Sequence, residues 1–238
     1  MTQSVKNQVP VAVIMPVYNG ETYIEEALNS ILNQTVYPAE IWVVDDGSTD
    51  AGIAKARTFA KKLPIPLTVL THETNQGLPA ALNTGIRASS ASLYMFLDAD
   101  DLFESEAVQR LYEGFIQNQA PVVMGVVRQF VCSLTQKKFN LTHNHVVGGG
   151  LGCMLITKQA FEQVGFFEED LKFGASLAWI SKAKKQGLNI QETPSLILNR
   201  RLHDHNMSHL KEGRAYFLEI AKRNIARHQE AKKQGANP

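Results

Sequence analysis

Short apolar runs alternate with stretches of helical periodicity in the first part of the chain. The runs cover residues 11–16, 41–45, 67–71 and 93–98. Such runs are typical of strands that are buried on both faces. The pattern predicts an α/β fold with a mostly parallel central sheet flanked by helices, and open sheets of this kind bind ligands at the carboxyl ends of their strands.

Helices are predicted where apolar residues recur three and four positions apart. This spacing is found over residues 24–32, 78–86 and 108–115, and Ser105 or Glu104 lies near the start of the third helix. Each of these segments leads from one apolar run towards the next, as βα units require.

The second half of the chain is less regular. Its pattern predicts a strand at 121–130, helices beginning near Lys158 and at Leu177, strands at 188–194 and 196–202, and a last amphipathic helix around 217–225. No linker and no internal repeat interrupts the sequence, so we predict one domain over residues 1–238.

Composition narrows the class of protein. With 44% hydrophobic and 20% charged residues, the chain is typical of a globular protein. Its 24 basic and 23 acidic residues leave a net charge of +1, which gives no reason to expect a nucleic-acid partner. No apolar run approaches the ~20 residues that cross a bilayer, so no transmembrane segment is expected. Two cysteines without CxxC spacing and a polar start without a secretory signal predict a cytoplasmic location, and peripheral contact with a membrane stays open.

Carboxylates follow two of the predicted strands. Asp45 and Asp46 end one run, and Asp98, Asp100 and Asp101 end another. Parallel strands bring these ends to one edge of the sheet, where ionised carboxylates repel one another unless a cation or hydrogen-bond donors offset their charge. Mg²⁺ or Mn²⁺ suits such a site. The alternative is turn and helix-cap chemistry, which uses the same residue types.

Four motifs read "VAVIMPVYNGETYIEEALNSILNQT", "IWVVDDGSTD", "NQGLPAALNTGI" and "FLDADD", and they cover residues 11–101 densely. In this order and spacing they resemble the family 2 glycosyltransferases of GT-A fold. A weaker likeness runs from "LGCMLITKQAFEQVGFFEEDLKFG" to "RLHDHNMS". The resemblance implies a nucleotide diphosphate sugar donor, an inverting transfer and a divalent metal, Mn²⁺ or Mg²⁺. It also implies a donor-binding half over about 10–130, an acceptor-side half over about 131–210, and a C-terminal helix and tail over 210–238.

The resemblance implies roles for residues at the predicted strand ends. Asp45 would contact the base, Asp98 would lie near the ribose or the metal, and Asp100 would coordinate the metal on the diphosphate. Asp101 is expected to serve the turn. The residues expected to bind the donor nucleotide are Pro16, Val17, Tyr18, Glu21, Asp45, Asn75, Gly77 and Asp98.

A later segment, "NRRLHDHNMSH", matches the family's Arg-x-His-x-x-Asn-x-Ser pattern and suggests a loop that folds over the donor diphosphate. His203 is a candidate metal ligand, and Arg200 or Arg201 a candidate phosphate partner. The alternative is a solvated cationic loop, because histidine is abundant in this segment. The matching residues are Arg201, His203, Asn206 and Ser208.

The general base that an inverting transfer requires is missing from its usual place. The family supplies it from a Glu-Asp pair at a helix start, and those two positions hold Ala175 and Ser176. Either another carboxylate serves, or the acceptor is acidic enough or assisted by another chain, or transfer is weak or absent. The candidate carboxylates are Glu168, Glu169, Asp170 and Asp204.

The sequence therefore predicts a glycosyltransferase with a UDP- or GDP-type donor. Its acceptor is unknown and could be a glycan, a lipid-linked glycan, a peptide or a small molecule. The alternative is a non-catalytic or weakly active nucleotide-sugar-binding protein on the same fold. A nucleotidyltransferase is disfavoured because the chain lacks a glycine-rich, basic N-terminal loop.

Overall fold

A computed structural model describes residues 7–135, 145–147, 150–171, 174–204 and 206. The strands form one nine-stranded sheet in the order β3-β2-β1-β4-β8-β6-β9-β5, with β7 paired to β6. They are β1 (Gln8–Val17), β2 (Tyr37–Asp45), β3 (Leu67–Thr71), β4 (Leu93–Phe96), β5 (Leu102–Phe103), β6 (Val122–Val131), β7 (His145–Val147), β8 (Met154–Thr157) and β9 (Ile190–Leu202).

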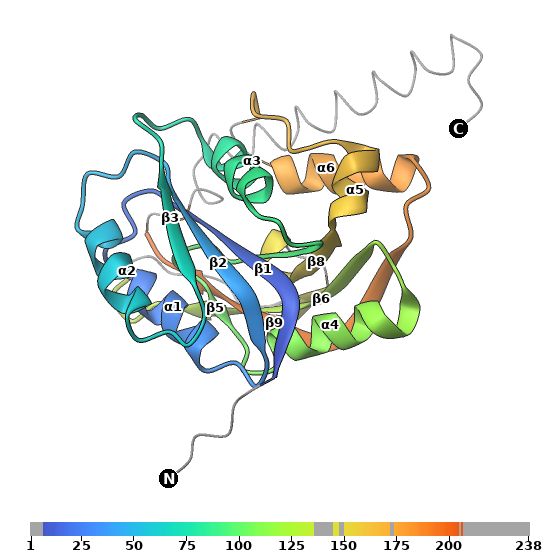
Figure 1. Cartoon of the computed structure of the whole chain (residues 1–238), viewed down its shortest axis with the longest axis horizontal. Coiled ribbons are helices and arrows are strands. Elements are labelled where there is room, and N and C mark those ends of the chain that lie inside the picture. The colour runs from blue at the N-terminus through green and yellow to red at the C-terminus, as the bar shows by residue number, and fades with distance from the viewer. Residues whose placement is uncertain (1–6, 136–144, 148–149, 172–173, 205, 207–238) are drawn as a thin grey trace.

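Helices cover the sheet in two groups. Figure 1 shows α3, α5 and α6 above the sheet and α1, α2 and α4 below it. In chain order they are α1 (Ile24–Leu32), α2 (Gly52–Ala60), α3 (Leu78–Ala88), α4 (Ala107–Asn118), α5 (Lys158–Val164) and α6 (Ala175–Lys185), and a short 3₁₀ helix spans Leu151–Cys153.

The direction of the strands decides where a site can form. β3, β2, β1 and β4 are parallel neighbours, and β6 pairs with β9 in parallel along much of its length. The antiparallel pairs involve the short strands β5, β7 and β8. The predicted mostly parallel α/β sheet is therefore confirmed, and the carboxyl ends of β1, β2 and β4 lie along one edge.

The core confirms most of the predicted elements. β1 and β4 are buried along their central residues, and α1 and α5 begin where the periodicity placed them. The prediction that residues 67–71 are buried on both faces is wrong, because β3 is the edge strand and its residues are half-buried or exposed. Helix α2 was not predicted, since its apolar face is weak. The helix expected around 217–225 lies outside the described residues.

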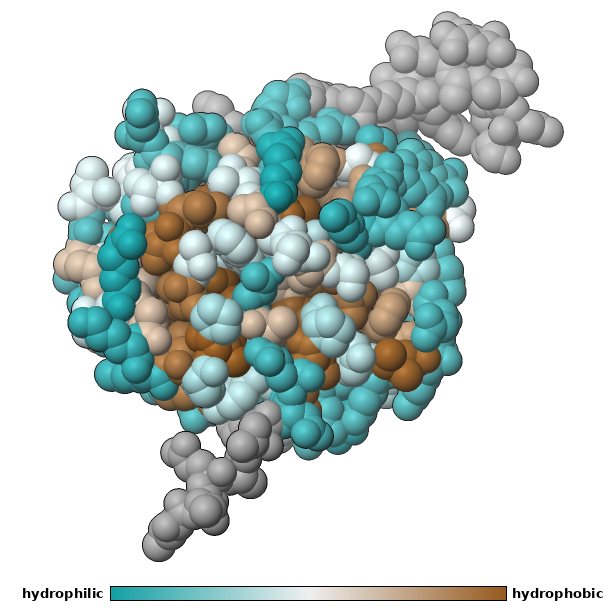
Figure 2. Space-filling view, viewed as in Figure 1, coloured by the Kyte–Doolittle hydropathy of each residue, from teal (hydrophilic) through white to brown (hydrophobic). Residues whose placement is uncertain are grey.

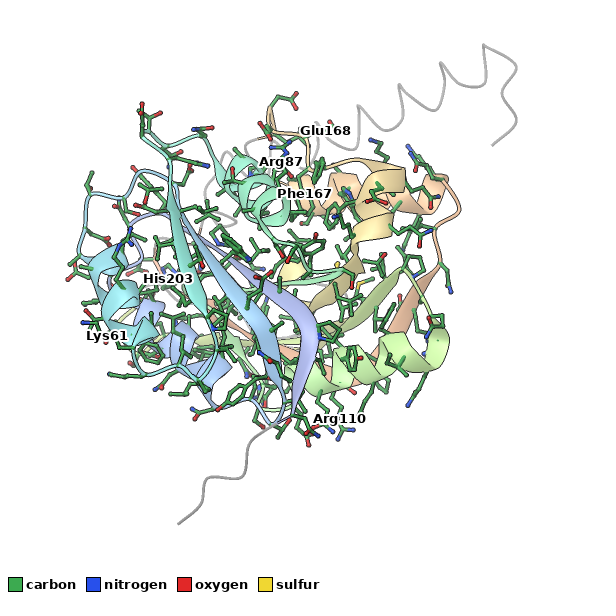
Figure 3. The ribbon with its side chains drawn as sticks, in the orientation of Figure 1. Lys61, Arg87, Arg110, Phe167, Glu168 and His203 are labelled. Carbon is green, nitrogen blue, oxygen red and sulfur yellow. The ribbon has the colours of Figure 1, made fainter. Side chains whose placement is uncertain are left out.

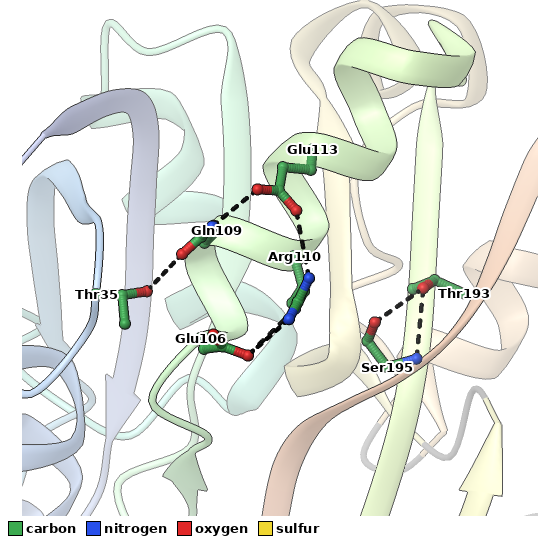
Figure 4. A network of polar contacts seen from close by, with 7 residues as sticks. All are labelled: Thr35, Glu106, Gln109, Arg110, Glu113, Thr193 and Ser195. Atoms are coloured by element: carbon green, nitrogen blue, oxygen red, sulfur yellow. Dashed lines mark hydrogen bonds and ion pairs between the residues drawn. The ribbon is translucent and has the colours of Figure 1, made fainter.

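The two strands predicted at 188–194 and 196–202 are one strand, β9. Its pairing with β6 slips twice, between Met124 and Val126, opposite residues 193–195 that include Pro194, and between Val126 and Val127, opposite Ile197. A bulge of this kind accommodates a proline, which has no N–H for the ladder. Figure 4 shows the Thr193 hydroxyl bonded to Ser195 beside this bulge, with Oγ1 and Oγ 3.1 Å apart.

Helix α4 is held mainly by its buried face rather than by its charges. Figure 4 shows Arg110 between Glu106 and Glu113, at 2.9 and 3.7 Å, on the exposed side of the helix. Exposed pairs of this kind contribute roughly 0.3–0.5 kcal/mol each. The Thr35 hydroxyl, which bonds Gln109 at 2.9 Å, ties the helix to the segment before β2.

The surface is mixed. Figure 2 shows apolar residues over the strands that face the viewer and mostly polar residues around the rim. Among the described residues, no helix is both long enough and apolar enough to cross a membrane.

Close packing of α3 on the sheet depends on Gly85. A Cβ at this position would lie 2.5 Å from Cγ2 of Ile14 and 3.2 Å from Cγ2 of Val44. Both neighbours are buried, β-branched residues of adjacent strands, so they have little room to move. α3 therefore lies at a distance from β1 that only glycine allows.

Replacing Gly85 by alanine should destabilise the fold. We expect Gly85→Ala to lower the free energy of unfolding by about 1–3 kcal/mol through overpacking, a loss that exceeds the ~1 kcal/mol gained in helix propensity. Urea unfolding measures the difference. Gly150→Ala is the control, because a Cβ at Gly150 meets no described atom within 4 Å. An unchanged midpoint in Gly85→Ala would show that α3 can move away from the sheet.

Candidate functional site

Three carboxylates gather in the turn that follows β4. One oxygen from each of Asp98, Asp100 and Asp101 lies within 4.8 Å of the others. Asp98 is exposed, Asp100 is half-buried and Asp101 is buried. The turn therefore presents two accessible carboxylates at the carboxyl edge of the sheet and keeps the third inside.

Asp98 is the accessible carboxylate with a perturbed pKa. Protein around it removes solvent and raises its pKa to about 6, and repulsion from Asp100 adds to the effect, while the charge of Arg200 opposes it. Asp98 as a whole residue is exposed, so a ligand can reach it. A bound cation would relieve this repulsion.

Asp101 serves the turn. Its Oδ1 accepts the backbone N–H of Arg201 at 2.8 Å, and its own N–H donates to the carbonyl of Asp98 at 3.1 Å. Burial, with repulsion from Asp100 and Asp98, raises the pKa of Asp101 well above its usual value, against the lowering effect of the Arg201 N–H. These contacts agree with the turn role expected for this residue.

Asp100 is held by the segment that follows β9. Its Oδ2 lies 2.8 Å from Nε2 of His203 and accepts from Nδ2 of Asn206 at 3.3 Å. The His203 N–H donates to Oδ1 of Asn206 at 2.6 Å, which closes the turn. The predicted partners Asp100, His203 and Asn206 are thus brought together. Ser208 lies outside the described residues.

Arg201 occupies the centre of this arrangement, and it is buried. Its Nη2 donates to Glu26 at 2.7 Å and its Nε to the carbonyl of Asp100 at 2.9 Å. The guanidinium also lies over the rings of Tyr23 and Phe130, 4.6 and 4.9 Å from their centroids. Sequence reasoning treated Arg201 as a candidate phosphate partner, and its contacts make it a structural tie between α1, β9 and the acidic turn.

The residues present fit a hard divalent ion. Asp98 and Asp100 offer accessible carboxylate oxygens, the ligands that Mg²⁺ and Mn²⁺ prefer. His203 is placed differently, because its Nε2 already contacts Asp100 and its side chain is nearly buried. In this arrangement His203 orients Asp100, and ligation by the same nitrogen would require that contact to break.

The end of β2 carries the second acidic pair. Asp45 is 5% exposed, and its Oδ1 accepts the N–H of Ser48 at 2.8 Å. Gly47 has φ +76°, and a Cβ there would lie 2.9 Å from the backbone N of Asn75. The turn after β2 therefore lies directly against the loop that holds Asn75 and Gly77, and the nucleotide-binding role of both stays a prediction.

The residues predicted to bind the nucleotide at the end of β1 differ in their exposure. Pro16 and Val17 are buried, whereas Tyr18 is 55% exposed and open to a ligand. The carboxylate of Glu21 lies 3.4 Å from Lys55, and its N–H donates to Asp50 at 2.7 Å. Glu21 thus joins the β1 end to the start of α2.

The sequence profile described as Glycosyl transferase family 2 matches residues 12–174. The matched segment is more than half of the 238-residue chain and contains both acidic strand ends. The chain belongs to glycosyl transferase family 2.

The relatives found by sequence are longer proteins than this chain. Glycosyltransferase GlyA of Streptococcus pneumoniae is 32% identical over 158 residues, which are 66% of this chain and 21% of the relative. The uncharacterized glycosyltransferase EpsJ of Bacillus subtilis is 41% identical over 113 residues, which are 48% of this chain and 32% of the relative. The chain thus spans about a fifth to a third of these relatives.

Solved structures share the fold. The mannosyltransferase PcManGT from Pyrobaculum calidifontis, in complex with GDP-Man and Mn²⁺, matches with TM-score 0.71 and 20% identity, over 91% of this chain and 64% of that one. TarS 1-349 of S. aureus in complex with UDP-GlcNAc matches with TM-score 0.68 and 21% identity, over 89% and 65%. At these identities the likeness shows the fold, and the predicted GT-A fold is confirmed.

In this family 2 chain, the helix that should carry the base is α6. Ala175 is 5% exposed and faces the core, and Ser176 is half-buried in the first turn. Only the second of these positions could present a side chain to a substrate without unpacking the core.

The candidate carboxylates lie in two places. Glu169 accepts from Asn83 at 2.8 Å and from Arg87 at 3.3 Å, and the Asn83 bond is the main cause of its lowered pKa. Figure 3 shows neighbouring Glu168 beside Arg87 and well apart from His203. Glu168 and Asp170, on either side of Glu169, belong to the same segment.

Asp204 lies at the other place. It directly follows His203, and its Oδ1 accepts the hydroxyl of Thr135 at 2.6 Å. Among the candidate bases, Asp204 is therefore the one next in sequence to His203, which contacts Asp100 of the acidic turn.

The pKa of Asp98 predicts how stability depends on pH. It rises from 3.8 to about 6 on folding, so the folded chain keeps a proton that the unfolded chain has lost. The free energy of unfolding of the metal-free protein should therefore fall as pH rises from about 4 to about 6. Asp98→Asn should reduce this slope. Urea unfolding in EDTA across that range measures it, with exposed Glu25→Gln as the charge-matched control, and an equal slope in Asp98→Asn would contradict the assignment.

Proposed function

We propose that this chain is a metal-dependent, inverting glycosyltransferase that moves a sugar from a UDP- or GDP-type donor to an acceptor. The observation that carries the proposal is that Asp45, at the end of β2, and Asp98 and Asp100, just after β4, follow parallel strands at one edge of the sheet in a family 2 chain. The complexes of fold neighbours with GDP-Man and Mn²⁺ and with UDP-GlcNAc support the class of donor.

In this proposal the turn after β2 binds the nucleotide base, and the turn after β4 binds the ribose and the metal. Asp45 contacts the base, Tyr18 and the loop of Asn75 and Gly77 close around the nucleotide, and Asp98 takes the ribose or the metal. Asp100 would hold Mn²⁺ or Mg²⁺, and the ion would supply positive charge to the leaving nucleoside diphosphate.

Arg200 is the candidate phosphate partner that its position favours. It directly precedes Arg201, whose N–H bonds Asp101, and its charge opposes the rise in the pKa of Asp98. Arg201 is buried against α1 and holds the turn instead.

The alternative function is nucleotide-sugar binding with weak or no transfer. The observation that favours it is the first turn of α6, where Ala175 and Ser176 stand in the positions of the expected Glu-Asp pair. The single-domain organisation and the cytoplasmic location stay predictions, and the acceptor stays open among a glycan, a lipid-linked glycan, a peptide and a small molecule.

A donor panel tests the proposal. The full chain is incubated with UDP- and GDP-sugars and Mn²⁺ or Mg²⁺, and both binding and release of nucleoside diphosphate are measured. We expect Asp100→Asn to weaken metal-dependent nucleotide binding by at least ~10-fold, because it removes a charged metal ligand. Glu25→Gln, an exposed carboxylate on α1, should bind as the unmodified chain does.

Two results would count against the proposal. If the unmodified chain binds no nucleotide diphosphate with either metal, the donor site is refuted. If it binds the donor and releases no diphosphate with any acceptor class, the non-catalytic alternative holds.

Restoring a carboxylate on α6 tests the missing base. We expect Ser176→Asp to raise donor turnover, up to the ~10²–10⁴-fold that a general base contributes. Ser176→Asn, of equal size but without a base, is the control. Ala175 is left unchanged because a carboxylate there would be buried in the core. An unchanged rate in Ser176→Asp would show that another carboxylate already serves, and Asp204→Asn is then the variant that should abolish transfer.

A further inference from the structure

A buried histidine links three elements beside the proposed nucleotide site. His72 directly follows β3, and its side chain is 9% exposed. Nδ1 lies 2.8 Å from Oδ1 of Asp46, which follows β2, and Nε2 lies 3.0 Å from Oγ1 of Thr84 on α3. One ring thus joins the end of β2, the end of β3 and the second turn of α3.

The partner of the histidine organises the nucleotide loop. Asp46 is 4% exposed, its Oδ1 also accepts the N–H of Gln76 at 2.8 Å, and its Oδ2 accepts the N–H of Gly77 at 2.8 Å. Gly77 has φ +95° and stands at the N-cap position of α3. The carboxylate therefore fixes the loop just where it turns into the helix, near the positive end of the helix dipole.

The main chain completes the link to the proposed base contact. The His72 N–H donates to the carbonyl of Asp45 at 2.8 Å, and the Asp46 N–H donates to the carbonyl of Val17 at 2.8 Å. The side chain of Asp45, the carboxyl end of β1 and the loop of residues 75–77 are thereby held in one arrangement.

The bonding pattern sets the histidine tautomer. A carboxylate that already receives two backbone N–H groups is an acceptor only, so Nδ1 carries the hydrogen that faces Asp46. The Thr84 hydroxyl can donate to Nε2 or accept from it, so the link to α3 holds for the neutral ring as well as for the cation.

We propose that His72 is a positioning residue for donor nucleotide binding, acting through Asp46 on the loop that carries Asn75 and Gly77. This inference rests on the proposed function. His72 is buried behind the loop and orders it before the nucleotide arrives, so less conformational entropy is lost on binding. Its loss should therefore weaken nucleotide binding and leave the metal ligands untouched.

The test is calorimetric titration of UDP and GDP in Mn²⁺. We expect His72→Leu, which keeps the volume and loses both bonds, to raise the dissociation constant on the order of 10-fold, the scale of lost supporting contacts. His72→Asn, whose Nδ2 can replace Nδ1, should recover most of the affinity. The affinity of His72→Leu for Mn²⁺ without nucleotide should equal that of the unmodified chain. A general loss of structure would lower that affinity too.

Thr84→Val provides a second variant if His72→Leu does not fold. It keeps the shape of the side chain and removes only the bond to Nε2, and we expect a several-fold weaker nucleotide affinity that Thr84→Ser restores. If Thr84→Val and a folded His72→Leu both bind nucleotide as tightly as the unmodified chain does, the inference about His72 is wrong. The proposed function would be unaffected by that result. If the unmodified chain binds neither nucleotide, the proposed function falls and the inference with it.

Discussion

The acidic edge of the sheet depends on one buried guanidinium. Arg201 is removed from water, and Glu26, the carbonyl of Asp100 and the rings of Tyr23 and Phe130 replace its hydration. A buried charge is tolerated only when such partners are present, and removing one partner leaves an uncompensated charge that costs several kcal/mol, roughly 3–5. The guanidinium also bonds the carbonyl of Asp100, and the Arg201 N–H bonds the carboxylate of Asp101, so the acidic turn is fixed from this one residue.

The proposed site is built from two turns with separate anchors. The turn after β4 is held from β9 and α1 by Arg201 and from the following segment by His203. The turn after β2 is held from β1, β3 and α3 by Asp46 and His72. Each turn is therefore held by its own set of neighbouring elements, and Asp98 and Tyr18 remain exposed.

Local patterns were enough to find β1, β2, β4 and β6 and the acidic ends of β2 and β4. A run of buried apolar residues followed by carboxylates is a local signal, and parallel pairing of β1, β2 and β4 brings such ends together. The role of Asp101 in the turn also follows from local chemistry. The edge position of β3 and the continuity of β9 could not be found in this way, because both depend on which strand lies alongside.

Residue types and their order determined the family, the class of fold and the carboxylates that face the site. Tertiary structure decided which side chains hold those carboxylates in place. Arg201 contacts Glu26 across 175 positions and His72 contacts Asp46 across 26, and no local spacing encodes such partners. The same holds at α6, where packing turns Ala175 into the core and leaves Ser176 half-buried. Whether a polar side chain supports the site from the interior or can reach a substrate depends on its burial. Burial is a property of the folded chain.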